Sequence, residues 1–398
     1  MRTLPLSLIL IGVGPAAFAQ GVNSPWEVET SLDMTVVAAA PGVDEAALPD
    51  QNGLWETSLG VAAEQTLSSG ITIGGRVVVR GARDNPARPA GTGNLGLTDT
   101  QGPAGAYSQF ALGPQFADQG ARASLETAYV FVETGYGEFS FGRDTGVAAR
   151  FQEGDVSALG SARLVDPYLD TSGLAVISTR PDVTGPSHKF TYTTPRLLGV
   201  RAGLSYTPEA GIRGLDKDAT GDPKVGRAGL ENVVELGLNA SRRLRESGVR
   251  LRAGLGYVTG VVEAPFGFEA DFDDRMDVVF AGGEVEWSDH YRFGVNWLSA
   301  DESVAAGGDY SAWSAGFGYQ RGDWDASLVW GRAELDSLGG DSEGISLAIR
   351  RAISESVAIS VAYQDRSLDL TGYADQTPIP YAQTRDGIVM EITLNLEK

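Results

Sequence analysis

Charged side chains at alternate positions of the chain are the residues with the clearest capacity for chemistry. In many short segments, one set of alternate positions is apolar and the intervening set is polar or charged. The intervening set includes Arg76, Arg80, Glu126, Lys189, Arg201, Glu235, Arg250, Arg252, Glu284 and Glu286. A dry core could not hold so many charges without partners, because burying an unpaired charge is costly. Charges that line a water-filled space, in contrast, can control which ions and polar solutes pass through it.

Bond-making chemistry has little support in the sequence. The chain has two histidines, His188 and His290, and neither has an obvious serine and aspartate arranged for a catalytic triad. The chain has no cysteine, which excludes disulfides and any zinc site made of thiolates. We therefore expect no enzymatic activity and no cofactor.

Calcium is the one metal for which the sequence offers candidate ligands. The stretch "EADFDDR" groups four acidic residues, which are Glu269, Asp271, Asp273 and Asp274. The stretch "GLDKDATGDP", residues 214–223, has three aspartates with glycines but lacks the glutamate at the twelfth position of an EF-hand. The alternative is that both stretches are solvated acidic loops with no bound ion.

Sixteen segments alternate with a period of two, which is typical of β-strands with unlike faces. They are residues 26–36, 55–63, 71–80, 123–131, 138–143, 189–194, 200–206, 234–240, 249–257, 279–287, 291–297, 313–319, 324–330, 345–349, 357–363 and 388–396. Seven tight connections, rich in Gly, Ser, Asp and Pro, alternate with eight mostly longer ones, which include 82–120, 144–187, 334–341 and 366–384. This rhythm predicts an all-β fold: a sixteen-stranded antiparallel transmembrane β-barrel with short turns at one rim and long loops at the other.

A soluble β-sandwich or soluble barrel would also alternate. A sandwich rarely reaches sixteen strands without a break in composition, and this chain has neither a break nor a linker. Aromatic residues gather near predicted strand ends, as Trp287 and Tyr291 do on either side of one turn. Such placement is typical of the aromatic girdles of membrane barrels. No apolar run after residue 19 approaches the length of a transmembrane helix.

Residues 1–19 have the pattern of a cleaved secretory signal peptide. A basic residue, Arg2, precedes a mostly apolar stretch at 4–13, and "AFA" at 17–19 matches a cleavage site. The alternative is a first buried strand or helix. Residues 20–398 would then form the barrel, with a formal charge of −22 instead of −21 because only Arg2 is lost. Such acidity argues against nucleic acid as a partner.

Two stretches resemble the Gram-negative general porins. "GEFSFGRDTG", residues 137–146, resembles the strand before the inward-folding third loop, and "SHKFTYTTPRLLGVRAGLSYTPE", residues 187–209, resembles the hairpin after that loop. The strand count and loop rhythm fit this family along the whole chain, and the alphaproteobacterial porins are the closest in pattern. One feature departs from the family: its members usually end in an aromatic residue that guides insertion, whereas this chain ends in "ITLNLEK".

The resemblance implies a homotrimer in the outer membrane, in contact with lipid and lipopolysaccharide. In each barrel the third external loop, residues 144–187, would fold inward as a constriction loop whose acids face basic residues on the wall. Arg143 matches the wall arginine of the motif, and the candidate acids of the loop are Glu153, Asp155, Asp166 and Asp170. The further wall candidates, by strand parity, are Arg76, Arg80, Lys189 and Arg201. For each residue the alternative is a solvated charge at the rim or in a loop.

Arg143 stands at an unusual position. Regular alternation would point four aromatic side chains toward lipid, which are Tyr129, Phe131, Phe139 and Phe141. Arg143 has the same parity, and an arginine at mid-membrane costs roughly 2–4 kcal/mol. We expect either a bulge at Gly142 that turns Arg143 into the interior, or a position at the strand end from which Arg143 reaches the rim.

Together these features predict an outer-membrane porin, a passive water-filled channel for small hydrophilic solutes and ions. The charge of −22 predicts a mild cation preference, which the wall arginines could cancel. Two alternatives stay open: a substrate-selective channel of the same fold, and a non-channel acidic adhesin or binding barrel. Acidic external loops could also bind divalent ions that bridge lipopolysaccharide.

Overall fold

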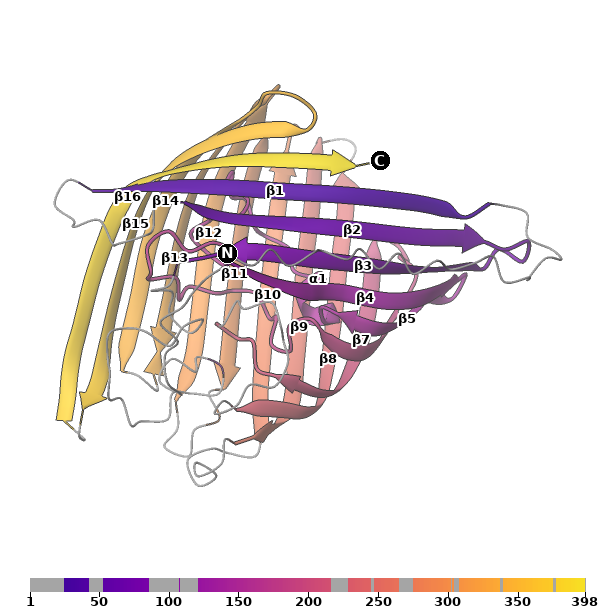
Figure 1. The fold of residues 1–398 in the computed structure, drawn as a ribbon, viewed down its shortest axis with the longest axis horizontal. Helices are drawn as coiled ribbons and strands as arrows, with labels where there is room; N and C mark the ends of the chain where they lie inside the picture. The colour runs from indigo at the N-terminus through magenta and orange to yellow at the C-terminus, as the bar shows by residue number, and fades with distance from the viewer. Residues whose placement is uncertain are drawn as a thin grey trace, which may run out of the picture.

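Apolar residues at every second position give each strand one face that excludes water, and antiparallel pairing satisfies the backbone groups between neighbours. The structure, a computed structural model, describes residues 25–42, 53–85, 107, 121–215, 228–244, 247–264, 275–301, 303, 308–336, 339–374 and 377–397. The strands follow one another round a closed ring in chain order, and β1 pairs with both β2 and β16 (Figure 1). This closure excludes the sandwich.

The described residues form sixteen strands, so the predicted number is confirmed. Their bounds are β1 (Glu27–Pro41), β2 (Leu54–Thr66), β3 (Thr72–Arg83), β4 (Arg122–Thr134), β5 (Gly137–Asp144), β6 (Ser187–Thr193), β7 (Val200–Gly211), β8 (Gly229–Leu244), β9 (Val249–Glu263), β10 (Arg275–Trp287), β11 (Tyr291–Asp301), β12 (Asp309–Arg321), β13 (Trp324–Leu335), β14 (Gly340–Ala352), β15 (Val357–Ala374) and β16 (Thr377–Glu397). Among these residues the α-helix is the single turn α1 (Val147–Arg150), and no helix there is long and apolar enough to cross a membrane.

At one end of the barrel the connections have two to six residues, as predicted. Strand β1 begins and β16 ends at this same end, because Glu27 pairs with Glu64 and Glu397 pairs with Ser31. The other end carries the long connections, among them residues 145–186 between β5 and β6. The predicted rhythm of short and long connections is therefore correct for most of the chain.

The last hairpin differs from the prediction. A loop was expected at 366–384, but β15 and β16 pair as far as Ala374 and Thr377. In this extension the apolar residues face the interior instead of the lipid, which is the opposite of the pattern in the rest of the strand. Leu368 and Leu370 are buried in the interior, whereas Asp369 is exposed. The extension was therefore not recognised as part of the strand. The predicted loop at 334–341 likewise shrinks to the four residues between β13 and β14.

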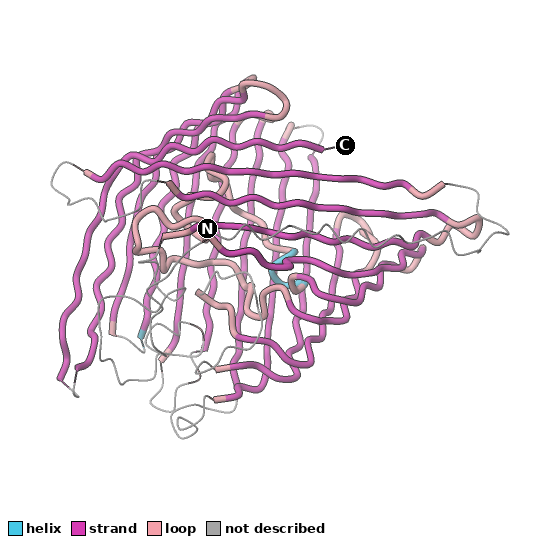
Figure 2. The backbone as a smooth tube through the Cα atoms, viewed as in Figure 1, coloured by secondary structure: helices cyan, strands magenta, loops and turns pink. Residues whose placement is uncertain are grey.

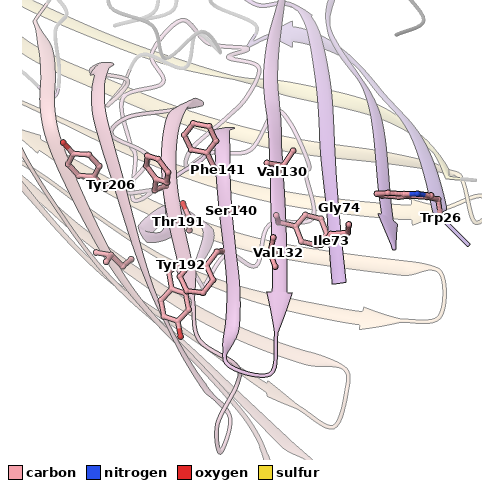
Figure 3. Close-up of a pocket in the computed structure, with 14 residues that line it drawn as sticks. Trp26, Ile73, Gly74, Val130, Val132, Ser140, Phe141, Thr191, Tyr192 and Tyr206 are labelled. Atoms are coloured by element: carbon pink, nitrogen blue, oxygen red, sulfur yellow. The ribbon is translucent and has the colours of Figure 1, made fainter. Parts of the chain in front are cut away.

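The outer face of the barrel is apolar. Leu32, Leu251 and Val361, which a soluble core would bury together, are 37%, 40% and 46% exposed. A groove of about 680 Å³ lies on this face over β3 to β7, and its lining is mostly aromatic and aliphatic. Figure 3 shows the side chains that line it, from Trp26 across to Tyr206. The apolar face of the strands therefore points outward, as a membrane barrel requires.

The interior has two different sectors. Near the short connections, charges pair across strands, as Arg252 and Glu284 do at 3.3 Å. Farther from that end, the interior side chains of β9 to β13 are buried and apolar, and they include Val258, Met276, Val278, Leu298, Ala300 and Ala312. They pack against Leu164, Leu174 and Ile177 of the connection between β5 and β6. A segment of the chain, instead of water, occupies this part of the predicted lumen.

Candidate functional site

Residues 145–186 lie inside the barrel (Figure 2), and their contacts reach separate sectors of its wall. Helix α1, at the start of this segment, packs against β7, β8 and β9. Farther along, the backbone N–H of Ala158 donates to Ser327 Oγ of β13 at 2.8 Å. The Ser161 hydroxyl donates to the Glu56 carboxylate of β2. We call residues 145–186 the inner loop, and these contacts confirm that it folds inward.

A carboxylate of the last strand holds the middle of the inner loop. Glu391 Oε1 accepts a hydrogen bond from the N–H of Gly160 at 2.8 Å. Its Oε2 accepts from the N–H groups of Ser161 and Ala162 at 2.9 and 3.0 Å. Glu391 is fully buried, and three consecutive donors offset the cost of removing its charge from water. The contact fixes the loop against β16.

Glycines on the interior face let the inner loop lie directly against the wall. One such glycine stands in each of eight successive strands: Gly203, Gly237, Gly254, Gly282, Gly294, Gly316, Gly331 and Gly344. We call this row the glycine belt. A Cβ added at Gly294 would lie 2.2 Å from the carbonyl oxygen of Gly154, and one at Gly254 would lie 2.2 Å from that of Phe151. No side chain fits between loop and wall there.

Two of the predicted acids are at least partly exposed on the inner loop. Glu153 is half-buried, and its Oε1 accepts a hydrogen bond of 2.7 Å from Asn239 Nδ2 of β8. Asp155 is exposed and forms an ion pair with Arg163, which is also on the inner loop. Their predicted partners on the wall are therefore replaced by an asparagine and by a loop arginine.

The other two predicted acids shape the inner loop itself. The Asp166 carboxylate accepts hydrogen bonds from the Ser178 hydroxyl and from the N–H of Thr179 at 3.1 Å. Asp170 is fully buried and accepts from the N–H groups of Gly173 and Ala175 at 3.0 and 3.1 Å. Neither side chain faces open water, because both satisfy backbone donors in turns.

Two of the predicted wall bases anchor the inner loop. Arg80 binds the Glu56 carboxylate and stacks over the Tyr168 ring, with Cζ 4.8 Å from the ring centroid. Lys189 Nζ donates to Thr184 Oγ1 at 2.9 Å and lies 3.8 Å from Glu235. Both bases are buried, so they support the loop without meeting the open interior.

The remaining wall bases are closer to water. Arg76 is exposed on the interior face, in register with Tyr129 of β4. Arg201 is partly buried, and its guanidinium donates to Thr193 Oγ1 at 2.6 Å and to the carbonyl of Thr194 at 3.1 Å. Of these two arginines, Arg76 is exposed, whereas Arg201 is held by Thr193, Thr194 and the Glu138 carboxylate, which lies 4.0 Å away.

Comparison with known proteins agrees with this architecture. A family model described as Gram-negative porin matches residues 7–369. The chain belongs to the Gram-negative porin family. This porin is an outer-membrane diffusion channel, and its family and fold are those of a channel, not of an enzyme. None of the curated proteins matches the chain.

Solved structures of low sequence identity share the fold. OmpF of Salmonella typhi, in complex with daunomycin, has a TM-score of 0.60 at 11% identity, over 93% of this chain and 97% of its own. The anion-selective porin of Comamonas acidovorans has a TM-score of 0.55 at 12% identity, over 94% and 99%. The outer membrane protein OmpT of Vibrio cholerae, in trimer form, has a TM-score of 0.56 at 12% identity, over 94% and 99%.

Arg143 of this porin is buried near the end of β5. The register between β4 and β5 continues through Gly142 without a bulge. Gly142 instead has φ +140°, a conformation that glycine adopts readily. Arg143 is buried beyond it, and its Nε donates to the carbonyl of Leu125 at 2.8 Å. The bulge expected at Gly142 is therefore absent, whereas Arg143 does stand near the end of its strand, as the other alternative expected.

The bulge lies one strand earlier, in β4. Val78 pairs with Thr127 and Val79 pairs with Leu125, so Glu126 is the extra residue. An extra residue reverses the face of every side chain that follows. The prediction that Tyr129 and Phe131 point toward lipid is therefore wrong: they share the face of Arg76 and Gly74. Val130 and Val132 are the exposed residues on the groove side, although Phe131 also borders the groove (Figure 3).

The predicted calcium residues, Glu269, Asp271, Asp273 and Asp274, lie outside the described residues, as does the predicted signal peptide. Within the described part of the chain, no group of three or more His, Asp or Glu side chains could hold a metal ion. His188 is exposed on the outer side of β6, and His290 lies in a short connection near Tyr319. Neither histidine belongs to the inner loop.

Proposed function

We propose that this porin is a general diffusion pore whose constriction is formed by residues 144–187. The observation that carries the proposal is the inner loop, which is tied to β2, β8, β13 and β16 inside a closed barrel. A chain segment held across a channel reduces the open cross-section to what remains between the segment and the free wall. Solutes would be selected by size and charge at that level, without any bond being changed.

The predicted site residues divide into two groups under this proposal. Arg76, Arg201, Glu153 and Asp155 are at least partly exposed and would meet passing solutes. Arg80, Arg143, Lys189, Asp166 and Asp170 are buried or engaged in turns and would hold the constriction in shape. The mild cation preference expected from the charge of −22 rests on the first group and on acids of β1 and β2, such as Glu29 and Glu64, which are exposed.

The decisive experiment is the swelling of liposomes that contain the purified porin. We expect swelling in small sugars, with a rate that falls as the sugar grows, because the constriction filters by size. A rate that saturates with one sugar would favour a substrate-selective channel instead. Absence of swelling with every sugar, in a sample shown to be folded, would contradict the diffusion-pore proposal.

We further propose a homotrimer, packed through the outer groove over β3 to β7. Strands β5 and β6, with eight and seven residues, are short, and their aromatic rings stack outward: Phe141 and Phe190 have centroids 4.5 Å apart. A lipid-facing surface has no need of such a groove, whereas a neighbouring barrel could fill it. The trimer form in the name of the Vibrio cholerae structure supports the trimer, and the groove is our proposal for its contact surface.

Other predictions stay as proposals. They are cleavage of residues 1–19, calcium binding at 269–274, contact with lipopolysaccharide, and an alphaproteobacterial source. The support for the last is the pattern of residues 137–146 and 187–209. Mass spectrometry of the mature protein would test the cleavage directly, since loss of residues 1–19 leaves Gln20 as the first residue.

A further inference from the structure

Three arginines converge on one tyrosine of the inner loop. Arg80 belongs to β3, whereas Arg163 and Arg180 belong to two separate parts of the inner loop. Their Cζ atoms lie 4.8, 5.6 and 6.0 Å from the centroid of the Tyr168 ring. Cations at these distances are attracted by the face of an aromatic ring. Three positive charges from separate segments of the chain therefore lie around one aromatic ring.

The three guanidinium groups differ in how far they are neutralised. Arg80 binds Glu56 and is buried. Arg163 pairs with Asp155, and its side chain keeps 22% of its surface exposed. Arg180 is half-buried. No carboxylate of the described residues lies within ion-pair distance of it, although the negative charges of Asp182 and Asp166 are near enough to stabilise its charged form. Its Nη1 donates to the Tyr168 hydroxyl at 2.7 Å, and its Nε has no hydrogen-bond partner among the described atoms.

The pKa of the Tyr168 phenol indicates a positive electrostatic potential at this position. This pKa is lowered, chiefly by the positive charge of Arg180 and also by that of Arg163, although burial opposes this change. A position that favours a phenolate over a phenol also favours other negatively charged oxygens. Guanidinium groups bind carboxylates and phosphates with two parallel hydrogen bonds, which a point charge cannot provide.

We propose that Arg163 and Arg180, both beside Tyr168, form a binding site for small oxyanions in this porin. The ligand class is a carboxylate or a phosphate monoanion or dianion, bound by the partly exposed guanidinium groups of Arg180 and Arg163. The site would hold such a solute briefly as it passes the constriction. This inference rests on the proposed constriction at residues 144–187, and it is independent of which ion the whole channel prefers.

The test is block of chloride current through the purified porin in a planar bilayer, with succinate and inorganic phosphate added in separate arms at constant ionic strength. We expect a saturable fall in conductance, and the arm with the lower half-saturating concentration identifies the preferred oxyanion. In Arg180→Gln that concentration should rise about tenfold, the loss expected for one charge-assisted hydrogen bond. The half-saturating concentration for Arg180→Lys should lie between those of the unchanged porin and Arg180→Gln. Arg321→Gln, which alters an exposed arginine at the short connections, should match the unchanged porin.

Isothermal titration calorimetry of the detergent-solubilised porin separates this proposal from that of the pore. Succinate or phosphate that binds without any measurable conductance would uphold the site and contradict the diffusion pore. Conductance that neither anion blocks, with no heat of binding, would overturn the site and leave the pore intact. Equal block of Arg180→Gln and unchanged porin would also overturn it.

Discussion

Glu391 Oε1 accepts a hydrogen bond of 2.8 Å from the N–H of Gly160, a residue 231 positions earlier in the chain. With the bonds to Ser161 and Ala162, this carboxylate joins the middle of the inner loop to the strand that closes the barrel. The loop is therefore part of the barrel's interior packing, and it differs from a surface loop that moves independently of its scaffold.

Replacing Glu391 by Gln should loosen the inner loop. The neutral amide keeps one acceptor oxygen and loses the charge, and a hydrogen bond to a charged group contributes about 1.5–3 kcal/mol. We expect hydrogen exchange at the amides of 160–162 to become at least roughly tenfold faster, measured by mass spectrometry of peptides. Glu397→Gln, at the exposed end of the same strand, is the matched control. Unchanged protection in Glu391→Gln would mean that the carboxylate does not hold the loop.

The glycine belt should be intolerant of even one added methyl group. In Gly294→Ala the new Cβ would meet the carbonyl oxygen of Gly154 at 2.2 Å, so loop or wall must move. We expect a loss of about 1–3 kcal/mol in the free energy of unfolding in urea, the usual cost of overpacking. Gly135→Ala, in a short connection where the Cβ meets no atom within 4 Å, should cost much less. Equal losses at the two positions would rule out close packing at Gly294.

Arg76 and Arg80 lie on the same face of β3 but should respond differently to alanine. Arg80→Ala leaves the Glu56 carboxylate without its positively charged partner, and breaking a buried ion pair in this way costs about 3–5 kcal/mol. Arg76→Ala removes an exposed charge and should leave the unfolding free energy within about 0.5 kcal/mol. Its effect should appear instead in the reversal potential across a salt gradient, shifted toward cations. An unshifted potential would place Arg76 outside the ion path.

The outer groove offers a test of the proposed trimer. Phe190 in the groove and Leu347 on β14 are both outward-facing, and each is 56% exposed in the single barrel. Arginine at either position carries a similar penalty against lipid. We expect Phe190→Arg to convert trimers into monomers in chemical cross-linking and native electrophoresis, while Leu347→Arg stays trimeric. Loss of trimers in both variants, or in neither, would argue against packing through the groove.

The overall architecture was accessible from the sequence because every strand carries its own signal. Alternation at residues such as Val249 to Tyr257 records which side chains meet water, and tight turns record where the chain reverses. The signal fails where a bulge changes the parity, as at Glu126, and where the apolar side faces inward, as at Leu368 and Leu370. At those places apolar and polar residues still alternate, but the apolar residues no longer face the lipid.

The candidate site was less accessible, because its contacts join residues far apart in the chain. No local pattern relates Glu391 to Gly160, or Arg180 to Tyr168 and Arg80. Burial of Asp170 and Lys189 also depends on how the loop packs, which parity cannot show. The glycine belt was the readable clue: a glycine at interior parity in eight successive strands marks a wall that must lie against something.

The bond between Glu391 and the inner loop also imposes an order on biogenesis. Its acceptor belongs to β16, which also completes the seam with β1, so the loop cannot reach its final position before the last strand is inserted. In an unfinished sheet the middle of the loop, Gly160 to Ala162, would therefore lack its carboxylate partner, even where the loop already contacts β7 to β13. A chain cut short of residue 391 would lack its seam and its internal brace together.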